Sequence, residues 1–477
     1  MGYKIGVDRW QQQLLPPSLE DYVPEDHICR VIRAFTEQLD IVVLGYKYAE
    51  TKSTGCRPYD PHIMLNLYIY GYLHRVRSSR RLRDETRRNV EVMWLMDGLQ
   101  PDDKTICNFR KDNTEALKET FRTFCRMCRE LGLYGGELVA TDGTKFQASN
   151  SRKNNYTKNK VKKELTRIDK AISEYMEELD QMDEEERDEI ENSGEEIRNA
   201  LEKLKSRKER YEELKKRVDK EGQFSTVDPD AKLMVSGSDG RKSEVCYNIQ
   251  TVVDSKNSMI VAFDVAEFLD TGNLCKMSEK AKEVLEVETL TNLADKGYYD
   301  GEDIAACEEK GVRCLVPKVK GGIKKATGYE YHNFVYDKEN DGIICPEKNV
   351  LRFTHEKKER NGRIARVYTN IAACKVCSCK TLCTKAKHRA IVRMPYQDTL
   401  EKMEERMKEN KALYHRRQEI VEHPFGTVKA VWGYKQYLCR TKIKISAETA
   451  LAYLAYNMRR AFNIFTENGL KMAEEIG

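Results

Sequence analysis

The chain has 477 residues, of which 40% are hydrophobic and 34% are charged. This length and apolar content predict a large core shared among two to four domains, and they exclude a single small module. The net charge of +5 excludes nucleic-acid binding through an overall charge excess, so any such surface must come from local clustering.

The opening residues, MGYKIGVDRW, lack the basic start and apolar run of a signal peptide. No window of the sequence approaches the run of about eighteen apolar residues that a membrane span needs. We therefore expect a soluble, cytoplasmic protein, associated with the nucleoid. The 15 cysteines, without an export signal, predict reduced thiols or metal ligands rather than disulfides.

Residues 61–100 predict two or three helices, because apolar and aromatic side chains recur at helical spacing from PHIMLNLYIYGYL onward. A local excess of arginines follows and predicts phosphate contacts by Arg75, Arg77, Arg80 and Arg81. The segment QPDDKTICNFRKDN predicts a further helix, capped by Asp102 or Asp103 and carrying Arg110 as another DNA contact. The region resembles a helix-turn-helix head, and a solvated helix face is the alternative.

The segment GGELVATDGTKFQA predicts a short strand over residues 138–140, with Asp142 at its polar end and Gly143 next to it. An acid at a strand end is a candidate metal ligand. Taken alone, such an aspartate is a common turn residue, so its significance depends on the rest of the chain.

Residues 156–220 are densely charged, yet apolar residues recur in steps of three and four along two stretches. This heptad pattern predicts a coiled-coil hairpin of two helices separated by an acidic break. An arm for self-assembly or for DNA and a solubilising spacer both remain open as its role. The seam positions are Val161, Leu165, Ile168, Ile172, Tyr175, Leu179 and Met182, then Ile197, Leu201, Leu204, Tyr211 and Val218.

Beyond this insertion, CYNIQTVVD and SMIVAFDVA predict an antiparallel strand pair joined by a turn. A helix then leads to LTNLADKGYYD, a short apolar run that ends at Asp295 with Gly297 close behind, as at Asp142. Another helix and the strand VRCLVP follow. The predicted order is three strands, a helix, a strand with an acid, a helix and a strand, which is the order of a ribonuclease H-like domain. The inserted hairpin explains the long gap between the two acids.

Five cysteines cluster between this strand and the last acidic helix, within a stretch that also predicts short strands. Four thiolates supply tetrahedral structural zinc, and the spacing of Cys345, Cys374, Cys377 and Cys383 fits such a site. Cys379 is then a spare or substitute ligand. Unliganded thiols in a small β insertion are the alternative.

The stretch YHRRQEIVEHPFGTVK ends a charged helix predicted from about Thr399 to Val421. Pro424 is expected to bend or restart the helix, with Lys429 beyond it. The candidate site residues here are Tyr414, Arg417 and Glu422. Arginine and lysine beside an acid suit the handling of a phosphate together with a metal.

Three carboxylates, Asp142, Asp295 and Glu422, would meet where the strands and this helix come together. Such a group predicts binding of two hard divalent cations about 4 Å apart, most simply Mg²⁺ (or Mn²⁺). Ions of this kind catalyse in-line displacement at phosphorus, with the nucleophile supplied by water or by DNA.

On these motifs the chain resembles the DDE transposases of bacterial insertion sequences, in the group with a Tyr-Arg-Glu-Lys signature around the last acid. The matching pieces, in order along nearly the whole chain, are PHIMLNLYIYGYL, FRK, ATDGTKF, ADKGYYD, the cysteine insertion, EHPFGTVK and ETALAYLAYNMRRAFNIF. One departure is that four residues separate Arg417 from Glu422, where the signature has three. This spacing leaves the role of Arg417 open.

The resemblance implies a metal-binding triad of Asp142, Asp295 and Glu422, with Tyr414, Arg417 and Lys429 contacting DNA near the cleaved phosphate. It also implies binding of terminal inverted repeats, strand transfer to target DNA, and a homodimer on paired ends. Rival hypotheses are a related nuclease or inactive relic, and a non-enzymatic, zinc-stabilised DNA-binding assembly protein. The expected division of the chain is a helical head (1–130), a catalytic α/β domain (131–155, 222–317 and 398–465), the hairpin (156–221) and the zinc insertion (318–397).

Overall fold

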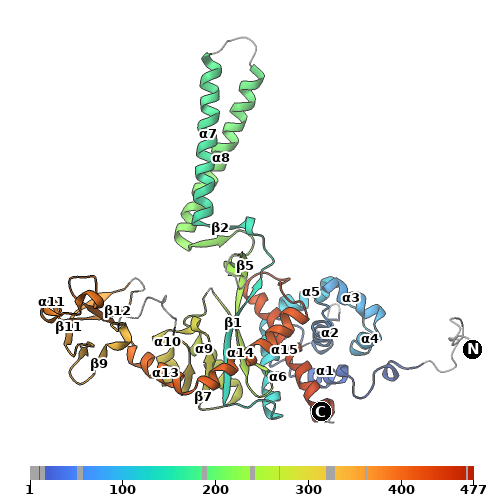
Figure 1. Cartoon of the computed structure of the whole chain (residues 1–477). Helices are drawn as coiled ribbons and strands as arrows, with labels where there is room; N and C mark the ends of the chain where they lie inside the picture. The colour runs from blue at the N-terminus through green and yellow to red at the C-terminus, as the bar shows by residue number, and fades with distance from the viewer. Residues whose placement is uncertain are drawn as a thin grey trace, which may run out of the picture.

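The computed structural model describes residues 10, 17–50, 57–184, 191–236, 242–267, 269–318, 328–359, 362–468 and 471–476. For 178–184 and 191–195 only the helical backbone is described. The fold is mixed α/β, with a helical N-terminal region, a central sheet, a long helical hairpin and a separate small sheet (Figure 1). No helix in the described ranges has the length and apolar character that a bilayer crossing requires.

The N-terminal region is helical, as predicted. Pro61 occupies the first turn of α2, where its missing N–H costs nothing, and the Asp60 side chain accepts from the His62 N–H. Asp102, not Asp103, caps the predicted helix over QPDDKTICNFRKDN by accepting from Thr105 N at 2.6 Å. The elements are η1 (Leu19–Tyr22), α1 (Ile28–Glu37), α2 (Pro61–Leu73), α3 (Ser79–Arg88), α4 (Val90–Leu95), α5 (Asp103–Asp112) and α6 (Thr114–Glu130).

The central sheet has the strand order β4-β5-β1-β7-β8, with β6 also paired to β5. β1 is parallel to β7, which is parallel to β8, whereas β5 is antiparallel to β1, β4 and β6. The antiparallel pair predicted from CYNIQTVVD and SMIVAFDVA is confirmed. The strands are β1 (Leu138–Gln147), β4 (Lys232–Ser236), β5 (Lys242–Asp254), β6 (Ile260–Ala266), β7 (Leu290–Ala294) and β8 (Val312–Leu315).

Helices cover this sheet and join it to the N-terminal region. α15 packs against α2 and α6, and α14 lies against β1, β5 and β7. One apolar core therefore runs from α1 and α2 through the sheet to the C-terminal helices. The covering elements are α9 (Leu274–Leu285), η3 (Lys296–Tyr298), α10 (Gly301–Glu309), α13 (Gln397–Glu409), α14 (Lys411–Phe425), η5 (Gly426–Val431), α15 (Lys442–Glu467) and α16 (Met472–Ile476).

The predicted hairpin consists of α7 (Lys158–Glu184) and α8 (Glu191–Glu221), which pack on each other and project from the body (Figure 1). Its base is a two-stranded ribbon of β2 (Asn155–Thr157) and β3 (Gln223–Ser225), preceded by η2 (Arg152–Asn154). Seam residues of both helices are buried: Val161, Ile168, Leu201 and Val218. The side chains of Leu179 and Met182 lie outside the described residues.

The cysteine-rich stretch contains a five-stranded antiparallel sheet of order β13-β12-β11-β10-β9 with its own small core. The strands predicted from FVYD and ARVYTNI are present as β9 and β12. The elements are η4 (Tyr331–Asn333), β9 (Val335–Asp337), β10 (Gly342–Ile344), β11 (Val350–Lys358), β12 (Ile364–Thr369), α11 (Ile371–Val376), α12 (Lys380–Cys383) and β13 (Ala390–Arg393).

Three local predictions were wrong. β1 does not end at Asp142, because its pairing with β5 continues through Gln147. The helix expected from Thr399 to Val421 is divided at Asn410 into α13 and α14. The helix also does not end near Val421: α14 includes Pro424, reaches Phe425 and continues directly into the π-helical turn η5, where the Trp432 N–H bonds to Thr427 O.

Candidate active site and metal-binding groups

The first two acids of the predicted triad lie on neighbouring strands. Parallel pairing aligns Thr141 of β1 with Ala294 of β7, and the residues that follow this pair are Asp142 and Asp295. Neighbouring strands are about 4.8 Å apart, which brings the two carboxylates to the same edge of the sheet. Asp295 accepts the Gly297 N–H at 2.7 Å, and Asp142 accepts the Gly143 N–H at 2.9 Å.

A third carboxylate, which the sequence did not single out, stands beside these two. Asp270, between β6 and α9, accepts from Asn248 Nδ2 at 2.8 Å and from Gln250 Nε2 at 2.7 Å. A β-carbon at Gly297 would lie 3.3 Å from Asp270 Oδ2 and 2.8 Å from Asp295 Oδ1. We call Asp142, Asp270 and Asp295 the aspartate cluster. Asp270 lies four residues beyond β6 rather than directly at its end, and its amide partners come from β5, so no local sequence pattern reveals it.

The aspartate cluster is electrostatically poised for a cation. Burial raises the pKa of Asp142 to about 6, and the negative charges of Asp295 and Asp270 act in the same direction. Arg417 opposes this rise in pKa through its positive charge. Oxygen ligands that repel one another in this way are the donor set that Mg²⁺ prefers.

α14 brings Arg417 and Tyr414 to the aspartate cluster. Arg417 Nη1 lies 3.3 Å from Asp142 Oδ2, and the two side chains are only 18% and 25% exposed. Burial raises the pKa of the Tyr414 phenol, and the charge of Arg417 lowers it. The ion pair thus locates Arg417 at the predicted site despite its unusual spacing from Glu422.

Glu422 is the predicted site residue that the structure does not bring to the cluster. Its side chain is exposed, and its Oε1 accepts from Gln418 Nε2 at 2.6 Å on the same helix. Five residues along an α-helix correspond to a rotation of about 140°, so Glu422 points to a different side of α14 from Arg417.

Lys429 approaches the same region from η5. Its Nζ donates to Lys145 O on β1 at 2.6 Å and lies 4.5 Å from the centroid of the Phe146 ring. Burial lowers the pKa of Lys429 to about 8, and the Asp142 carboxylate partly offsets this effect. The ammonium is therefore held on β1, a few residues beyond the aspartate cluster.

The predicted DNA-contacting arginines of the N-terminal region separate into two groups. Arg75, Arg80 and Arg81 are exposed. Arg77 is turned inward, with Nη1 3.0 Å from Gln436 O and 3.3 Å from Glu448 Oε1.

Arg110 was predicted to contact DNA, but it is only 8% exposed, and its Nη1 donates to Tyr72 Oη at 3.3 Å. Its guanidinium also lies 5.7 Å from the centre of the Tyr68 ring. Arg110 is thus a core residue in this structure, because it lies on the face of α5 that packs inward.

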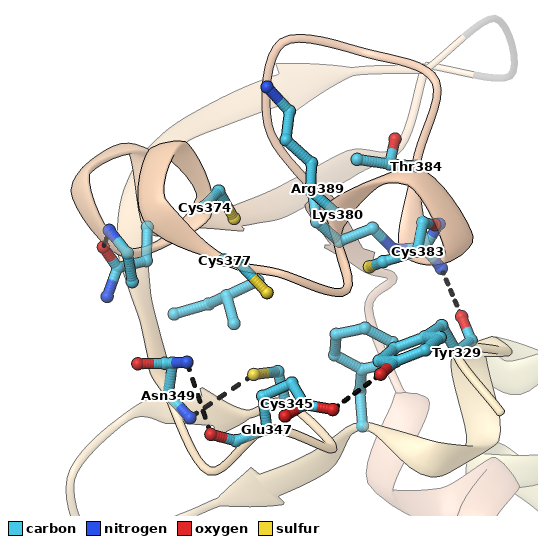
Figure 2. Close-up of a pocket in the computed structure, with 14 residues that line it drawn as sticks. Tyr329, Cys345, Glu347, Asn349, Cys374, Cys377, Lys380, Cys383, Thr384 and Arg389 are labelled. Atoms are coloured by element: carbon cyan, nitrogen blue, oxygen red, sulfur yellow. Dashed lines mark hydrogen bonds between the residues drawn. The ribbon is translucent and has the colours of Figure 1, made fainter.

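Four cysteines of the predicted zinc site line one pocket of the small sheet, as Figure 2 shows. Cys345 follows β10, Cys374 lies in α11, Cys377 follows α11, and Cys383 ends α12. Burial raises the pKa of the Cys383 thiol, and the charges of the other three sulfurs act in the same direction.

A backbone N–H supports one of these sulfurs, because Asn349 N donates to Cys345 Sγ at 3.3 Å (Figure 2). Such a bond favours a thiolate and is typical of the turn that presents a metal ligand. Cys379 is not among the residues that line the pocket, and its Sγ lies 3.7 Å from Ser378 Oγ. The pocket therefore contains the four predicted cysteines without the fifth.

Comparison with protein families gives two matches in chain order. Residues 17–112 match a transposase domain (DUF772), and residues 344–462 match a transposase DDE domain. Searches of curated proteins and of solved structures returned no match. The first match covers the N-terminal helices from η1 to α5. The second covers β11 to β13 of the small sheet, α13, α14 and most of α15. A DDE domain is the domain of a DNA-cutting enzyme that uses divalent metal. Together these two matches, which cover less than half of the chain, support a DDE transposase of insertion-sequence type.

Proposed function

We propose that this transposase binds the terminal inverted repeats of its insertion sequence, cleaves the DNA at the ends and joins them to target DNA. Asp142, Asp295 and Glu422 would be its metal-binding triad. The observation that carries the proposal is the adjacency of Asp142 and Asp295 at the edge of a parallel strand pair, with Arg417 3.3 Å from Asp142.

The strand order supports a ribonuclease H-like catalytic domain. β4 pairs only with the first residues of β5. Without β4, the strands β1, β5, β6, β7 and β8 stand in the spatial order β6-β5-β1-β7-β8, and β5 is antiparallel to β1. In open α/β sheets, sites form at the carboxyl ends of parallel strands. Asp295 follows β7 directly, and Asp142 is its neighbour on β1.

The donor atoms fit a hard divalent cation. All are carboxylate oxygens, and the raised pKa of Asp142 reflects first its burial and then repulsion by Asp295 and Asp270, both of which a bound cation would offset. Divalent ions at this position would supply Lewis-acid activation of the attacking water or 3′-hydroxyl and of the leaving oxygen. Asp142 and Asp295 would hold them, and Asp270, fixed by two amides, keeps the site strongly negative.

The cations around the aspartate cluster suit the scissile phosphate. Arg417 would exchange its contact with Asp142 for a phosphate oxygen once metal neutralises the carboxylate, and Lys429 would hold a neighbouring phosphate. Glu422, which accepts a hydrogen bond from Gln418, would complete the triad after a change of its rotamer or a rotation of α14. DNA and metal together provide the charge that favours this movement.

The test compares wild-type protein with Asp295→Asn on duplexes that carry the ends of the element. Asparagine keeps an acceptor for the Gly297 N–H but removes the charge. We expect magnesium-dependent cleavage to fall by about a thousandfold or more while end binding changes less than about threefold. The control is Asp264→Asn, because Asp264 on β6 pairs with Lys276 and Lys280 away from the cluster.

Unchanged cleavage by Asp295→Asn would remove the triad assignment. Cleavage by the wild type without any joining would favour the related nuclease. Binding without cleavage in either Mg²⁺ or Mn²⁺ would favour the relic or the assembly protein.

We also propose that Cys345, Cys374, Cys377 and Cys383 hold a structural zinc ion in the small sheet. The support is the shared pocket and the N–H bond to Cys345 Sγ. A site closed by four thiolates leaves no position for substrate, so its role would be to stabilise the sheet.

A further inference from the structure

The hairpin of α7 and α8 has opposite charges at its two ends. Its proximal half, residues 158–170 and 203–220, contains 15 Lys and Arg against 6 Asp and Glu. Its distal half, residues 171–202, contains 14 Asp and Glu against 2 Arg. A solubilising spacer needs charge but no such separation, so the asymmetry indicates a partner for one half only.

Many cations of the proximal half are not used by the fold. Some pair within the hairpin, as Arg207 does with Glu164 at 3.1 Å and Lys208 with Asp169 at 2.8 Å. Others are exposed and make no side-chain hydrogen bond or ion pair within the ranges that the structure describes. These are Lys162, Lys163, Arg167, Lys203, Lys205, Arg210, Lys215, Lys216 and Lys220.

The base of the hairpin is firmly attached to the catalytic sheet. Tyr156 and Phe224 stack with ring centroids 5.4 Å apart in a small core with Val161 and Val218. Asn150 Nδ2, just beyond β1, donates to Ser225 Oγ at 2.7 Å. The proximal half is therefore a fixed surface rather than a tethered one.

The same strand carries the aspartate cluster and leads to this base. Gln147 lies five positions after Asp142 on β1, a rise of about 17 Å. A DNA duplex is about 20 Å wide, and 18 helical residues extend about 27 Å, so DNA leaving the cluster along β1 would run beside the basic half.

We propose that the proximal half of the hairpin is a DNA-binding surface that holds phosphates of the duplex flanking the cleavage site, while the acidic distal half keeps DNA from the tip. The inference rests on the proposed function, since it places DNA at the aspartate cluster. Fixed exposed ammonium and guanidinium groups fit a duplex because each phosphate contact releases a counterion. A second copy of the chain at this surface is the competing occupant.

The test uses a variant with Lys162, Lys163, Arg167, Lys203 and Arg210 all changed to Gln. Its matched control changes five exposed acids of the same hairpin, Glu177, Glu202, Glu209, Glu212 and Glu213, to Gln. Helical content by circular dichroism should equal that of the wild type in both. The probe is a duplex of about 40 base pairs carrying an element end, with binding measured by fluorescence anisotropy from low to high salt.

We expect the cation variant to bind at least tenfold more weakly at low salt, with a slope of log affinity against log salt that is smaller by about 3. The control should bind as tightly as the wild type or more tightly. An equal slope in wild type and cation variant would overturn the inference, as would an equal loss in the control. A changed oligomeric state with unchanged DNA affinity would assign the surface to a second copy, which also overturns it. Failure of the wild type itself to bind would instead contradict the proposed function.

Discussion

Around Asp142, two charged side chains are buried in a way that reduces the stability of the folded protein. Burial and two neighbouring acids raise the pKa of Asp142, and burial lowers that of Lys429. Each group would be more stable as a neutral species or in water. Unfavourable burial of charged groups is a feature of functional sites, because a bound ligand can stabilise the charges.

Lys429 allows a test of how much the burial of a charged group lowers the free energy of unfolding. The pKa of Lys429 is about 8 in the folded protein, against about 10.4 for an unfolded lysine. Between these values the unfolded state binds more protons, so stability should rise with pH there, and the cost should be complete below pH 8. We expect Lys429→Met to raise the free energy of unfolding at pH 7 by about 1 kcal/mol and to flatten its rise between pH 8 and 10.

Urea denaturation at pH 7, 8.5 and 10 measures this effect. The control is Lys435→Met, since Lys435 is exposed, and it should change stability by less than about 0.5 kcal/mol. If Lys429→Met is less stable than the wild type at pH 7, the conclusion that the buried ammonium destabilises the protein is wrong. The same substitution should weaken cleavage of end DNA, because it removes a phosphate contact.

Residue types and local spacing predicted that Asp142 and Asp295 would lie together in the sheet. Asp142 and Asp295 each follow an apolar run and precede a glycine, a pattern that indicates an acid at the end of a buried strand. Asp270 could not be found, because its partners Asn248 and Gln250 come from β5. Arg110 was misassigned because charge alone does not reveal that a helix face packs inward.

Among the elements, α14 and η5 have the most direct effect on the site. Pro424 lacks the N–H that would bond back to residue 420, and the hydrogen bonding then widens into a π-helical turn rather than ending. The wider turn carries Lys429 to β1, where it meets Lys145 O. The sequence showed the proline but not whether the chain would break there, because packing against the sheet decides between the two.

The small sheet should depend on metal. Its core consists of a few residues, including Phe334, Ile343 and Tyr368, which is little apolar burial for five strands. We expect about one zinc per chain in purified protein, and Cys377→Ser should remove it. Chelation should lower the melting temperature of this part by about 5–10 °C.

Cys379→Ser is the matched control, because Cys379 lies outside the pocket, and it should retain zinc. Elemental analysis of the two variants and the wild type makes the comparison. Less than about a tenth of an equivalent in the wild type would remove the zinc assignment.

At the scale of the whole molecule, the helical head and the catalytic sheet share one core. Arg77, between α2 and α3, stacks 4.3 Å from the Tyr434 ring centre and pairs with Glu448 of α15, which is 1% exposed. Tyr434 in turn donates to the backbone of Tyr72. The sequence assigned Arg77 to DNA because it lies in an arginine-rich stretch, whereas its partners come from the far end of the chain.

Arg77→Ala should therefore act on stability. Removing Arg77 leaves the buried Glu448 carboxylate with only the N–H groups of Leu438 and Cys439 as partners, and we expect a loss of about 2–3 kcal/mol. Arg80→Ala, at a side chain that is 82% exposed, should change stability by less than about 0.5 kcal/mol and weaken DNA binding instead. Equal stability of the two variants, measured by chemical denaturation, would return Arg77 to the DNA-binding group.

The shared core also determines when the enzyme can become active during its synthesis. α1 packs against α15 and α16 as well as against its near neighbours α2 and α4, so its burial is completed only by the final segments of the fold. Contacts between such distant segments form slowly, and apolar surface stays uncovered until they do. A ribosome must release the C-terminal helices before the N-terminal ones can finish folding. We therefore expect DNA-cutting activity to appear only after α15 and α16 have left the ribosome.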